Sequence, residues 1–207
     1  MFEATGIILA GGRGSRMNGA DKARLIVDRR CLLDRQVETM RRWFTEVIIV
    51  AGPHRCYEYS GVKQVFDERP DCGPLMGLYS GLHASSHDLN FVAACDMPYI
   101  SDKLIELLMN SAVDNKTADA VVPLVKGFHE PLLAVYHKNV LPGVKDSIDS
   151  GQLKMISFYE KINILDIPED KVTAVDPGLL SFLNINTPHD WHLARQVFGK
   201  PAMGESG

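Results

Sequence analysis

Four glycines crowd a short loop directly after the first apolar run of the chain, and this junction constrains the fold more than any other feature. The apolar run covers residues 7–10, and the loop that follows contains Gly11, Gly12, Gly14 and Gly19. A short continuous apolar run that stops at a turn is typical of a buried strand. Because glycine has no Cβ, its backbone N–H groups can turn toward an anion and approach it closely. We therefore expect a buried strand that ends in an anion-binding loop.

Basic side chains lie in and directly after this loop, at Arg13, Arg16, Lys22 and Arg24. They belong to a basic first segment: residues 1–42 have a net charge of +4, whereas the whole chain has −4 and the remainder therefore −8. No aromatic residues alternate with these cations, as they would in a surface that binds single-stranded nucleic acid. This pattern favours one local phosphate-rich ligand over a nucleic-acid surface.

Two well-known phosphate loops do not fit this segment. Gly14 and Gly19 have the glycine spacing of a P-loop, but Ala20 and Asp21 stand where Lys and Ser or Thr are required. The dinucleotide fingerprint Gly-x-Gly-x-x-Gly fails because Met17 stands in place of its third glycine. On the glycines alone, an ordinary glycine-rich turn with solvated cations is an equally good interpretation.

Residues 9–22 read Leu-Ala-Gly-Gly-Arg-Gly-Ser-Arg-Met-Asn-Gly-Ala-Asp-Lys. This stretch resembles the signature Leu-Ala-Gly-Gly-x-x-x-Arg-Met-x-x-x-Asp-Lys of the molybdenum cofactor guanylyltransferases, which are nucleotidyltransferases. The opening residues are shared with sugar-phosphate and cytidylyl relatives, so alone they indicate only the superfamily. Asn18 stands where one common variant of the signature has glycine. Further motifs that resemble the family occur in its order along the chain: Asp67, Gly73-Pro-Leu-Met-Gly77, Cys95-Asp-Met-Pro98, Glu130-Pro131 and Asn184-Ile-Asn-Thr-Pro188.

Length and composition indicate one α/β domain. The 207 residues suit a single large domain over 1–198, followed by a short tail, 199–207, that we expect to be disordered. No apolar stretch approaches the roughly 20 residues that span a membrane, and the N-terminus does not resemble a secretion signal. The four cysteines form no Cys-x-x-Cys pair. We therefore expect free thiols, a cytoplasmic protein and no contact with membranes.

Apolar periodicity predicts strands alternating with helices along most of the chain. The expected strands cover 47–51, 62–66, 89–95, 120–124, 131–136, 162–167 and 183–186. The expected helices cover 32–44, 75–85, 101–109, 140–150 and 153–159, and a last one starts at the N-cap pattern Thr187-Pro-His-Asp190. Such alternation predicts an α/β fold with a doubly wound, mainly parallel sheet in three αβα layers, Rossmann-like as in nucleotidyltransferases.

In folds of this class, ligands bind beyond the carboxyl ends of the strands. The expected strands place several polar or glycine residues along that edge, namely Gly52, Asp67, Asp96, Asn184 and Asn186. Asp96 is the most informative of these, because a carboxylate that ends an apolar run needs water, a cation or a helix N-terminus. Mg²⁺ binds one or two carboxylates together with phosphates and water. The alternative is that Asp96 only caps the turn into the helix at 101.

Asp67 is a second carboxylate at a strand end, and a plain turn residue ahead of Pro70 is an equally good interpretation of it. The resemblance implies that Asp96 binds Mg²⁺ and that an Asp ahead of the Gly-Pro-Leu-x-Gly motif contributes to nucleotide binding. Asp71 competes with Asp67 for this second assignment. The turn at Gly73 opens a helix whose N–H groups face either the ligand or the core.

The resemblance implies a pterin substrate, and three polar residues in the later part of the chain are candidates for binding it. Asn184 and Asn186 lie two apart on an expected strand, so their carboxamides share a face, although Asn186 could simply support the following helix. The resemblance places Asn-x-Asn-Thr-Pro near the pterin and a basic residue near Lys154. A solvated lysine is the alternative for Lys154.

The resemblance implies that the terminal phosphate of molybdopterin attacks the α-phosphorus of GTP and releases pyrophosphate. Our hypothesis is that Arg16, Lys22 and Asp96 are catalytic and that Asp96 holds Mg²⁺. Expected nucleotide contacts are Leu9, Ala10, Gly11, Gly12, Gly14, Lys22, Gly52, Asp67, Gly73 and Asp96. Proteins that deliver the cofactor or receive it are conceivable partners. The alternatives are a cytidylyltransferase or sugar-phosphate nucleotidyltransferase and, in a different class, a noncatalytic nucleotide-binding module.

Overall fold

The computed structural model describes residues 1–11, 22–27, 29–53, 55–69 and 72–198, except for the side chains of residues 22, 188 and 195–198. The strands are β1 (Phe2–Leu9), β2 (Ile26–Val27), β3 (Arg30–Cys31), β4 (Phe44–Ala51), β5 (Lys63–Phe66), β6 (Leu89–Ala94), β7 (Ala120–Val125), β8 (Phe128–His129), β9 (Leu133–His137) and β10 (Ile164–Ile167). The α-helices are α1 (Leu32–Trp43), α2 (Gly73–Ala84), α3 (Asp102–Asp114), α4 (Leu141–Asp149), α5 (Glu169–Val175) and α6 (Pro188–Phe198). Short 3₁₀ turns are η2 (Lys22–Arg24), η3 (Lys138–Val140), η4 (Tyr159–Lys161) and η5 (Leu180–Phe182).

The strands form a mixed sheet with a parallel core, in the order β10-β7-β9-β6-β1-β4-β5, and β8 pairs with β7. β1 runs parallel to β4 and to β6, whereas β9 runs antiparallel to β6 and to β7. The expected α/β fold with a mainly parallel sheet is therefore confirmed. Because β9 runs antiparallel to β6, the first residues of β9 lie at the carboxyl end of β6.

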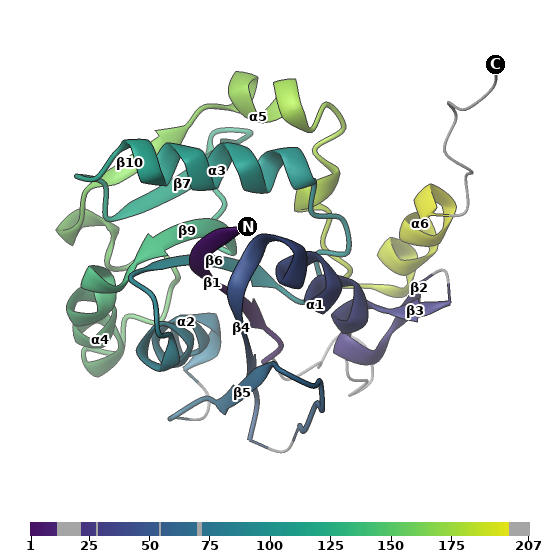
Figure 1. Ribbon diagram of the computed structural model, residues 1–207, viewed down its shortest axis with the longest axis horizontal. Helices are drawn as coiled ribbons and strands as arrows, with labels where there is room; N and C mark the ends of the chain where they lie inside the picture. Colours follow the sequence, from purple (N-terminus) through teal and green to yellow (C-terminus); the bar gives the residue numbers. More distant parts are fainter. Residues whose placement is uncertain (12–21, 28, 54, 70–71, 199–207) are drawn as a thin grey trace.

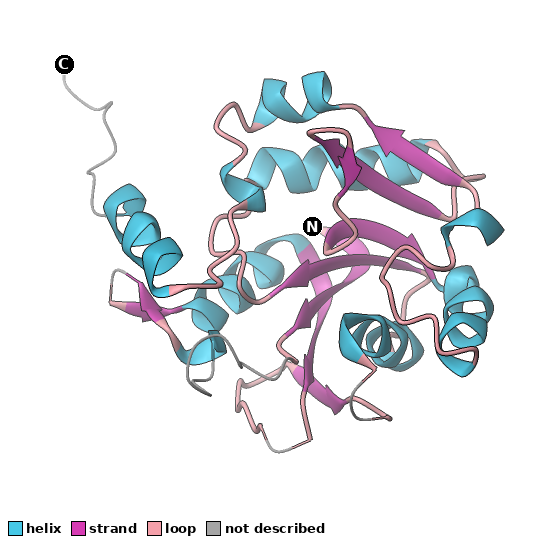
Figure 2. Cartoon of the chain, turned by 180° about the vertical axis from the view of Figure 1, so that it is seen from behind, coloured by secondary structure: helices cyan, strands magenta, loops and turns pink. Residues whose placement is uncertain are grey.

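Helices cover both faces of the sheet, which gives the three layers seen in Figures 1 and 2. One apolar core lies under α1, α3 and α5, and a second lies under α2 and α4. A smaller cluster, in which Ile185 and Ala194 pack against Val27 and Leu32, joins α6 to the β2–β3 hairpin. Each face of the sheet therefore buries its own apolar stripe, as a continuous strand pattern requires.

Two glycines let α2 approach the sheet closely. A Cβ built on Gly81 would lie 2.7 Å from Cγ2 of Ile7 and 3.1 Å from Cγ2 of Val50, and one on Gly77 would lie 3.3 Å from Cδ2 of Leu9. These distances leave little room for any side chain. α2 is thus seated directly on β1 and β4, which fixes the position of its N-terminus at the carboxyl edge of the sheet.

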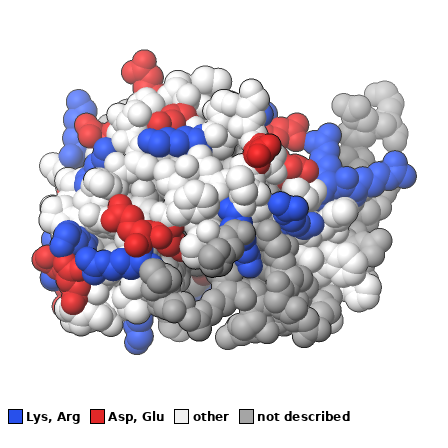
Figure 3. Space-filling model, turned by 90° about the horizontal axis from the view of Figure 1, so that it is seen from below, with Lys and Arg blue, Asp and Glu red and all other residues white. Residues whose placement is uncertain are grey.

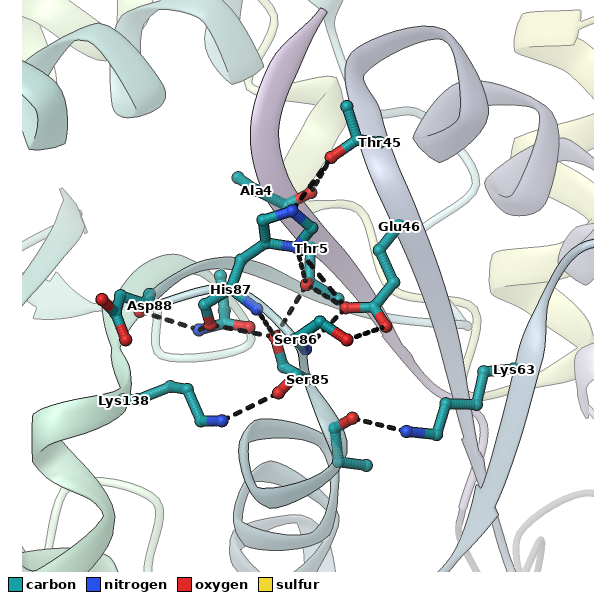
Figure 4. A network of polar contacts seen from close by, with 12 residues as sticks. Ala4, Thr5, Thr45, Glu46, Lys63, Ser85, Ser86, His87, Asp88 and Lys138 are labelled. Atoms are coloured by element: carbon teal, nitrogen blue, oxygen red, sulfur yellow. Dashed lines mark hydrogen bonds and ion pairs between the residues drawn. The ribbon is translucent and has the colours of Figure 1, made fainter.

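The opposite end of α2 is held by a compact polar network (Figure 4). The Thr5 hydroxyl donates to Glu46 at 2.6 Å and lies 2.7 Å from the Ser85 hydroxyl and 3.0 Å from Nδ1 of His87. Glu46 also accepts hydrogen bonds from the backbone N–H and the hydroxyl of Ser86. Burial alone would raise the pKa of Glu46, but these hydrogen bonds outweigh it and lower that pKa.

Two lysines complete this end of the helix. Lys63 Nζ donates to the Ala84 carbonyl at 2.6 Å and Lys138 Nζ donates to the Ser85 carbonyl at 2.8 Å. The last carbonyls of a helix lack internal partners and carry partial negative charge, so cations are favourable there. α2 is therefore anchored at its C-terminus, while its N-terminus lies at the carboxyl edge of the sheet.

The structure differs from the sequence expectation in several places. The expected helix over 153–159 is wrong, because this segment forms turns and η4 while Met155, Phe158 and Tyr159 fill the core under α4. The expected strand over 183–186 is also wrong, since no neighbouring strand pairs with it among the described residues. The short helix α5, the short strand β8 and the β2–β3 hairpin were not predicted. The tail 199–207 lies outside the described residues.

Candidate active site

Three strand ends converge where the glycine-rich loop begins. Ala10 N–H donates to Val50 O at 2.8 Å and Asp67 N–H donates to Ala51 O at 3.2 Å, which aligns the ends of β1, β4 and β5. A Cβ built on Gly11 would lie 3.2 Å from Oδ2 of Asp67 and 3.9 Å from the backbone N of Gly52. Gly11, Gly52 and Asp67, three of the expected nucleotide contacts, are therefore neighbours.

The Asp67 carboxylate is wedged between the start of the loop and α2. Its Oδ1 is buried and has no hydrogen-bond partner among the residues described here, and a Cβ on Gly77 would lie 3.6 Å from it. Burial raises the pKa of Asp67 to about 6. A carboxylate oxygen buried in this way costs stability unless a ligand or another group compensates it. The competing residue, Asp71, lies outside the described residues.

Asp96 lies in the turn that directly follows β6. Cys95 N–H donates to Leu9 O at 3.0 Å, and the buried Gln36 of α1 donates from Nε2 to Ala94 O at 2.9 Å and to Met97 O at 2.5 Å. These bonds hold the residues on both sides of Asp96 and leave its half-buried side chain at the carboxyl edge, next to β1.

The capping alternative for Asp96 does not fit this geometry. α3 begins at Asp102, and Ser101 occupies the N-cap position. The Ser101 hydroxyl makes no capping bond to the helix and is directed to the Val175 carbonyl at 3.5 Å. Asp96 precedes the helix by a whole turn of loop, so capping does not account for it.

Several of the expected loop contacts fall outside the part of the chain that the structure describes. Gly12, Gly14 and Arg16 are among them, and Lys22 is described only by its backbone, which opens η2. The side chains of Leu9 and Ala10 are buried, so any contact that these two residues make with a nucleotide must come from their backbone.

The N-terminus of α2 also lies at this carboxyl edge of the sheet. Gly73 has φ +66°, a conformation that strains any residue with a Cβ, and a Cβ there would meet nothing within 4 Å. The glycine is thus required by the backbone conformation rather than by lack of space. Pro74 follows in the first turn, where its missing N–H costs nothing. The free N–H groups of this helix start are suited to an anion.

The candidate pterin residues fall into two places. Ile185 N–H donates to Asp96 O at 2.9 Å, so Asn184 and Asn186 flank a residue bonded directly to the end of β6. Although no strand forms, Ile185 is buried and its two neighbours are half-buried, as in an extended chain. Asn186 also supports the start of α6, because its N–H donates to Oδ2 of Asp190 at 3.0 Å.

Lys154 is separated from these asparagines. It lines a surface pocket of about 420 Å³ that is formed by residues of the 151–160 loop. Apolar residues of this loop pack in the core under α2 and α4, whereas Ile185 packs beside α6. The structure therefore associates Asn184 and Asn186 with Asp96 and gives no such link for Lys154.

Gln36 is a supporting residue that the sequence reasoning missed. It is buried, and its amide holds the turn that carries Asp96. The available signal was an amide on the apolar face of the predicted 32–44 helix, between Leu33 and Met40. A polar group at such a position needs a buried partner.

The charged side chains on one face of the molecule show no basic stripe in its described part. On the face shown in Figure 3, Lys and Arg side chains are interspersed with Asp and Glu, and over its described part they form no continuous field of one sign. A nucleic-acid surface needs an extended basic stripe. Within the described chain, no helix is both long and apolar enough to cross a membrane.

Sequence comparison matches this chain to a family and to full-length relatives. The family described as MobA-like NTP transferase domain matches residues 6–162. A molybdenum cofactor guanylyltransferase of Desulfosudis oleivorans is 35% identical, covering 92% of this chain and 93% of the relative. A probable molybdenum cofactor guanylyltransferase of Natranaerobius thermophilus is 33% identical, covering 94% and 96% of the two chains.

Solved structures agree with this result. The molybdopterin-guanine dinucleotide biosynthesis protein A of Archaeoglobus fulgidus superposes with a TM-score of 0.80 at 25% identity, covering 94% of this chain and 98% of the other. The 2-C-methyl-D-erythritol 4-phosphate cytidylyltransferase of Thermus thermophilus has a TM-score of 0.68 at 19% identity, covering 95% and 98%, and shares the fold.

Proposed function

Since the chain belongs to the MobA-like NTP transferase family and is a molybdenum cofactor guanylyltransferase, a nucleotidyltransferase, we propose that its residues bind GTP and molybdopterin in two adjacent halves of one site. The ends of β5, β4 and β1 form a nucleotide half, defined by Gly11, Gly52 and Asp67. The end of β6 forms an acceptor half, defined by Asp96 with Asn184 and Asn186. Both groups lie at the same edge of the sheet, next to the end of β1. This arrangement is the observation that supports the proposal.

In the reaction, one P–O bond forms and one P–O bond breaks. An oxygen of the terminal phosphate of molybdopterin attacks the α-phosphorus of GTP, the bond from that phosphorus to the oxygen bridging to the β-phosphate breaks, and pyrophosphate leaves. The acceptor gains GMP and becomes a dinucleotide. Two polyanions must be held together while charge moves to the leaving oxygens, so positioning and electrostatic stabilisation supply the catalysis and no covalent enzyme intermediate is needed.

The chain provides groups suited to each part of this task. The backbone at Gly11 and Gly52 and the N-terminus of α2 at Gly73 offer N–H groups to the nucleotide. We assign Lys22 and Arg16 to the transferred and leaving phosphates, as their positions in the sequence signature imply. Asn184 and Asn186 lie where they can orient the acceptor beside Asp96.

The carboxylates at this edge fit Mg²⁺. Asp96 is half-buried at the end of β6, and Oδ1 of Asp67 is buried without a partner in the described part of the chain. No group of three or more His, Cys, Asp or Glu side chains suited to a metal occurs among the described residues, but Mg²⁺ needs only one or two carboxylates besides phosphates and water. Asp96 would hold the ion, which when bound neutralises phosphate charge.

The decisive experiment measures pyrophosphate release with molybdopterin and each of GTP, CTP, ATP and UTP, with and without Mg²⁺. We expect release with GTP that requires both molybdopterin and Mg²⁺. Preference for CTP would instead indicate a cytidylyltransferase, and nucleotide binding without release would indicate a noncatalytic module.

Lys22→Ala tests the role of the loop cations. We expect the barrier to rise by about 2–4 kcal/mol, as for removal of another preorganised charge-stabilising group. Lys116→Ala, which removes an exposed lysine distant in sequence from the loop, is the control and should leave turnover unchanged. Undiminished turnover of Lys22→Ala at saturating Mg²⁺ and substrates would contradict the assignment. Proteins that deliver the cofactor or receive the product are further partners consistent with this function.

A further inference from the structure

The β8–β9 connection brings one unassigned carboxylate, Glu130, to the acceptor half. Leu133 pairs with Ala93, and Ala94 N–H donates to Leu132 O at 3.0 Å. The residues before β9 therefore lie at the carboxyl end of β6, beside the turn that carries Asp96. β9 adjoins β6 on the side away from β1, β4 and β5.

The hairpin that presents Glu130 is braced at several points. Lys126 N–H donates to Glu169 at 2.5 Å, and Nε2 of His129 lies 2.8 Å from Oδ1 of Asp166. The His129 ring also packs edge-on against Tyr159, with the ring centroids 5.3 Å apart. Side chains of α5, β10 and η4 thus fix this segment.

The Glu130 side chain is directed away from these braces. Its backbone N–H donates to Pro123 O at 2.9 Å, which continues the β7–β8 pairing by one residue. Because side chains alternate along a strand, Glu130 lies on the face opposite His129. His129 faces Tyr159, on the α2–α4 side, so Glu130 faces the α3–α5 side, where the 96–101 turn leads into α3.

The negative charge of the Glu130 carboxylate is only weakly compensated by neighbouring groups. It is half-buried, and neither a hydrogen bond nor an ion pair joins it to another residue in the described part of the chain. Burial raises the pKa of Glu130, and the charge of Lys126 opposes that effect only in part. A rigidly held, partly desolvated acceptor group at a binding edge is suited to a ligand that offers N–H donors.

We propose that Glu130 is a specificity-determining residue that binds the amidine edge of the pterin in the acceptor substrate. In a 2-amino-4-oxo pteridine, the ring N3–H and the 2-amino group are parallel donors, which match the two oxygens of a carboxylate. Guanine offers the same donor pair, but the nucleotide half lies on the other side of β6, two strand spacings or on the order of 10 Å from β9. This inference rests on the proposed function.

The test compares two small fluorescent probes, 6-hydroxymethylpterin and 6-hydroxymethyllumazine, bound to the full chain in the presence of Mg²⁺ and GTP. Lumazine replaces the 2-amino donor with a carbonyl acceptor, which repels a carboxylate. Wild type should bind the pterin at least about tenfold more tightly. Glu130→Gln should reverse the preference, because an amide both accepts from N3–H and donates to the lumazine carbonyl.

The controls separate a lost contact from a lost fold. Glu3→Gln changes an exposed glutamate at the start of β1, on the opposite edge of the sheet, and should retain the wild-type preference. Glu130→Ala should bind both probes with nearly equal affinity, and unchanged affinity for Mg²⁺–GTP shows that a variant is folded. If Glu130→Gln does not fold, Glu130→Ala decides the question.

A folded variant that lacks the carboxylate but still prefers the pterin would overturn the inference, as would a wild type that does not discriminate. The assay is independent of turnover. Failure to transfer GMP to molybdopterin, with the probe preference present and lost on substitution, would refute the proposed reaction but leave the pterin contact supported.

Discussion

Replacing Asp67 with Asn should stabilise the folded protein and weaken its hold on the nucleotide. Oδ1 of Asp67 is buried without a partner among the described residues, and burial raises the pKa of this carboxyl to about 6. The folded state therefore disfavours the ionised form relative to the unfolded chain. Asn has nearly the same shape and carries no charge, so it removes this penalty.

The magnitude and its pH dependence follow from proton linkage. A rise from the usual pKa of about 3.9 to about 6 corresponds to about 3 kcal/mol for a fully shielded carboxylate. Asp67 as a whole is only half-buried, so solvent screening reduces the expected gain to about 1–2 kcal/mol. The penalty is complete above pH about 6, where the group is ionised in both states. It disappears below pH about 4, where the group is protonated in both states.

Urea denaturation without nucleotide at pH 8 and pH 4 measures this difference for wild type and Asp67→Asn. Asp114→Asn is the control, because Asp114 is exposed at the end of α3. We expect a gain for Asp67→Asn at pH 8 only, together with weaker binding of Mg²⁺–GTP. A gain that is equal at both pH values, or a loss of stability at pH 8, would refute the reasoning.

Two further substitutions test the seating of α2. Gly81→Ala should destabilise the protein by about 1–2 kcal/mol, since overpacking against Ile7 outweighs the better helix propensity of alanine. The control is Gly143→Ala in α4, where a Cβ has room, and this change should be neutral or stabilising. Equal denaturation midpoints for the two variants would contradict the close contact between α2 and the sheet. Glu46→Gln should destabilise the protein at pH 7. The pKa of Glu46 is lowered in the folded state, so its ionised carboxylate stabilises the fold at any pH above the usual pKa of a glutamate. This stabilisation is lost when the carboxylate is protonated, so the difference between the two proteins should fade as the pH falls below about 4. Denaturation at pH 7 and pH 3 checks this, and a difference that does not change with pH would show that the ionised form is not involved.

The main strands and the edge that carries the site could be predicted because each apolar run stops at a polar or glycine residue. Asp67 and Asp96 were identified in this way, and the capping pattern Thr187–Asp190 predicted the start of α6. These features are local, since a few neighbouring residues encode both the end of an element and the group placed there.

The sequence predictions were wrong where tertiary contacts determine the local structure. The apolar residues of 153–159 have a helical spacing, but in the structure they are buried from turns under α4. An extended pattern at 183–186 suggested a strand, yet its backbone bond goes to Asp96 O rather than to a neighbouring strand. Nothing local reveals that β9 runs antiparallel to β6, so the approach of Glu130 to the acceptor half could not be predicted.

The two halves of the site are built on strands that differ in how easily they open. β5, which precedes Asp67, is a four-residue edge strand paired only with β4 in the described part of the sheet, whereas β6, which precedes Asp96, lies between β1 and β9. Local unfolding begins at edges, where few bonds must break, and reaches central strands last. On the proposed assignment, the strand beside the nucleotide half should therefore open more readily than the strand that leads to Asp96.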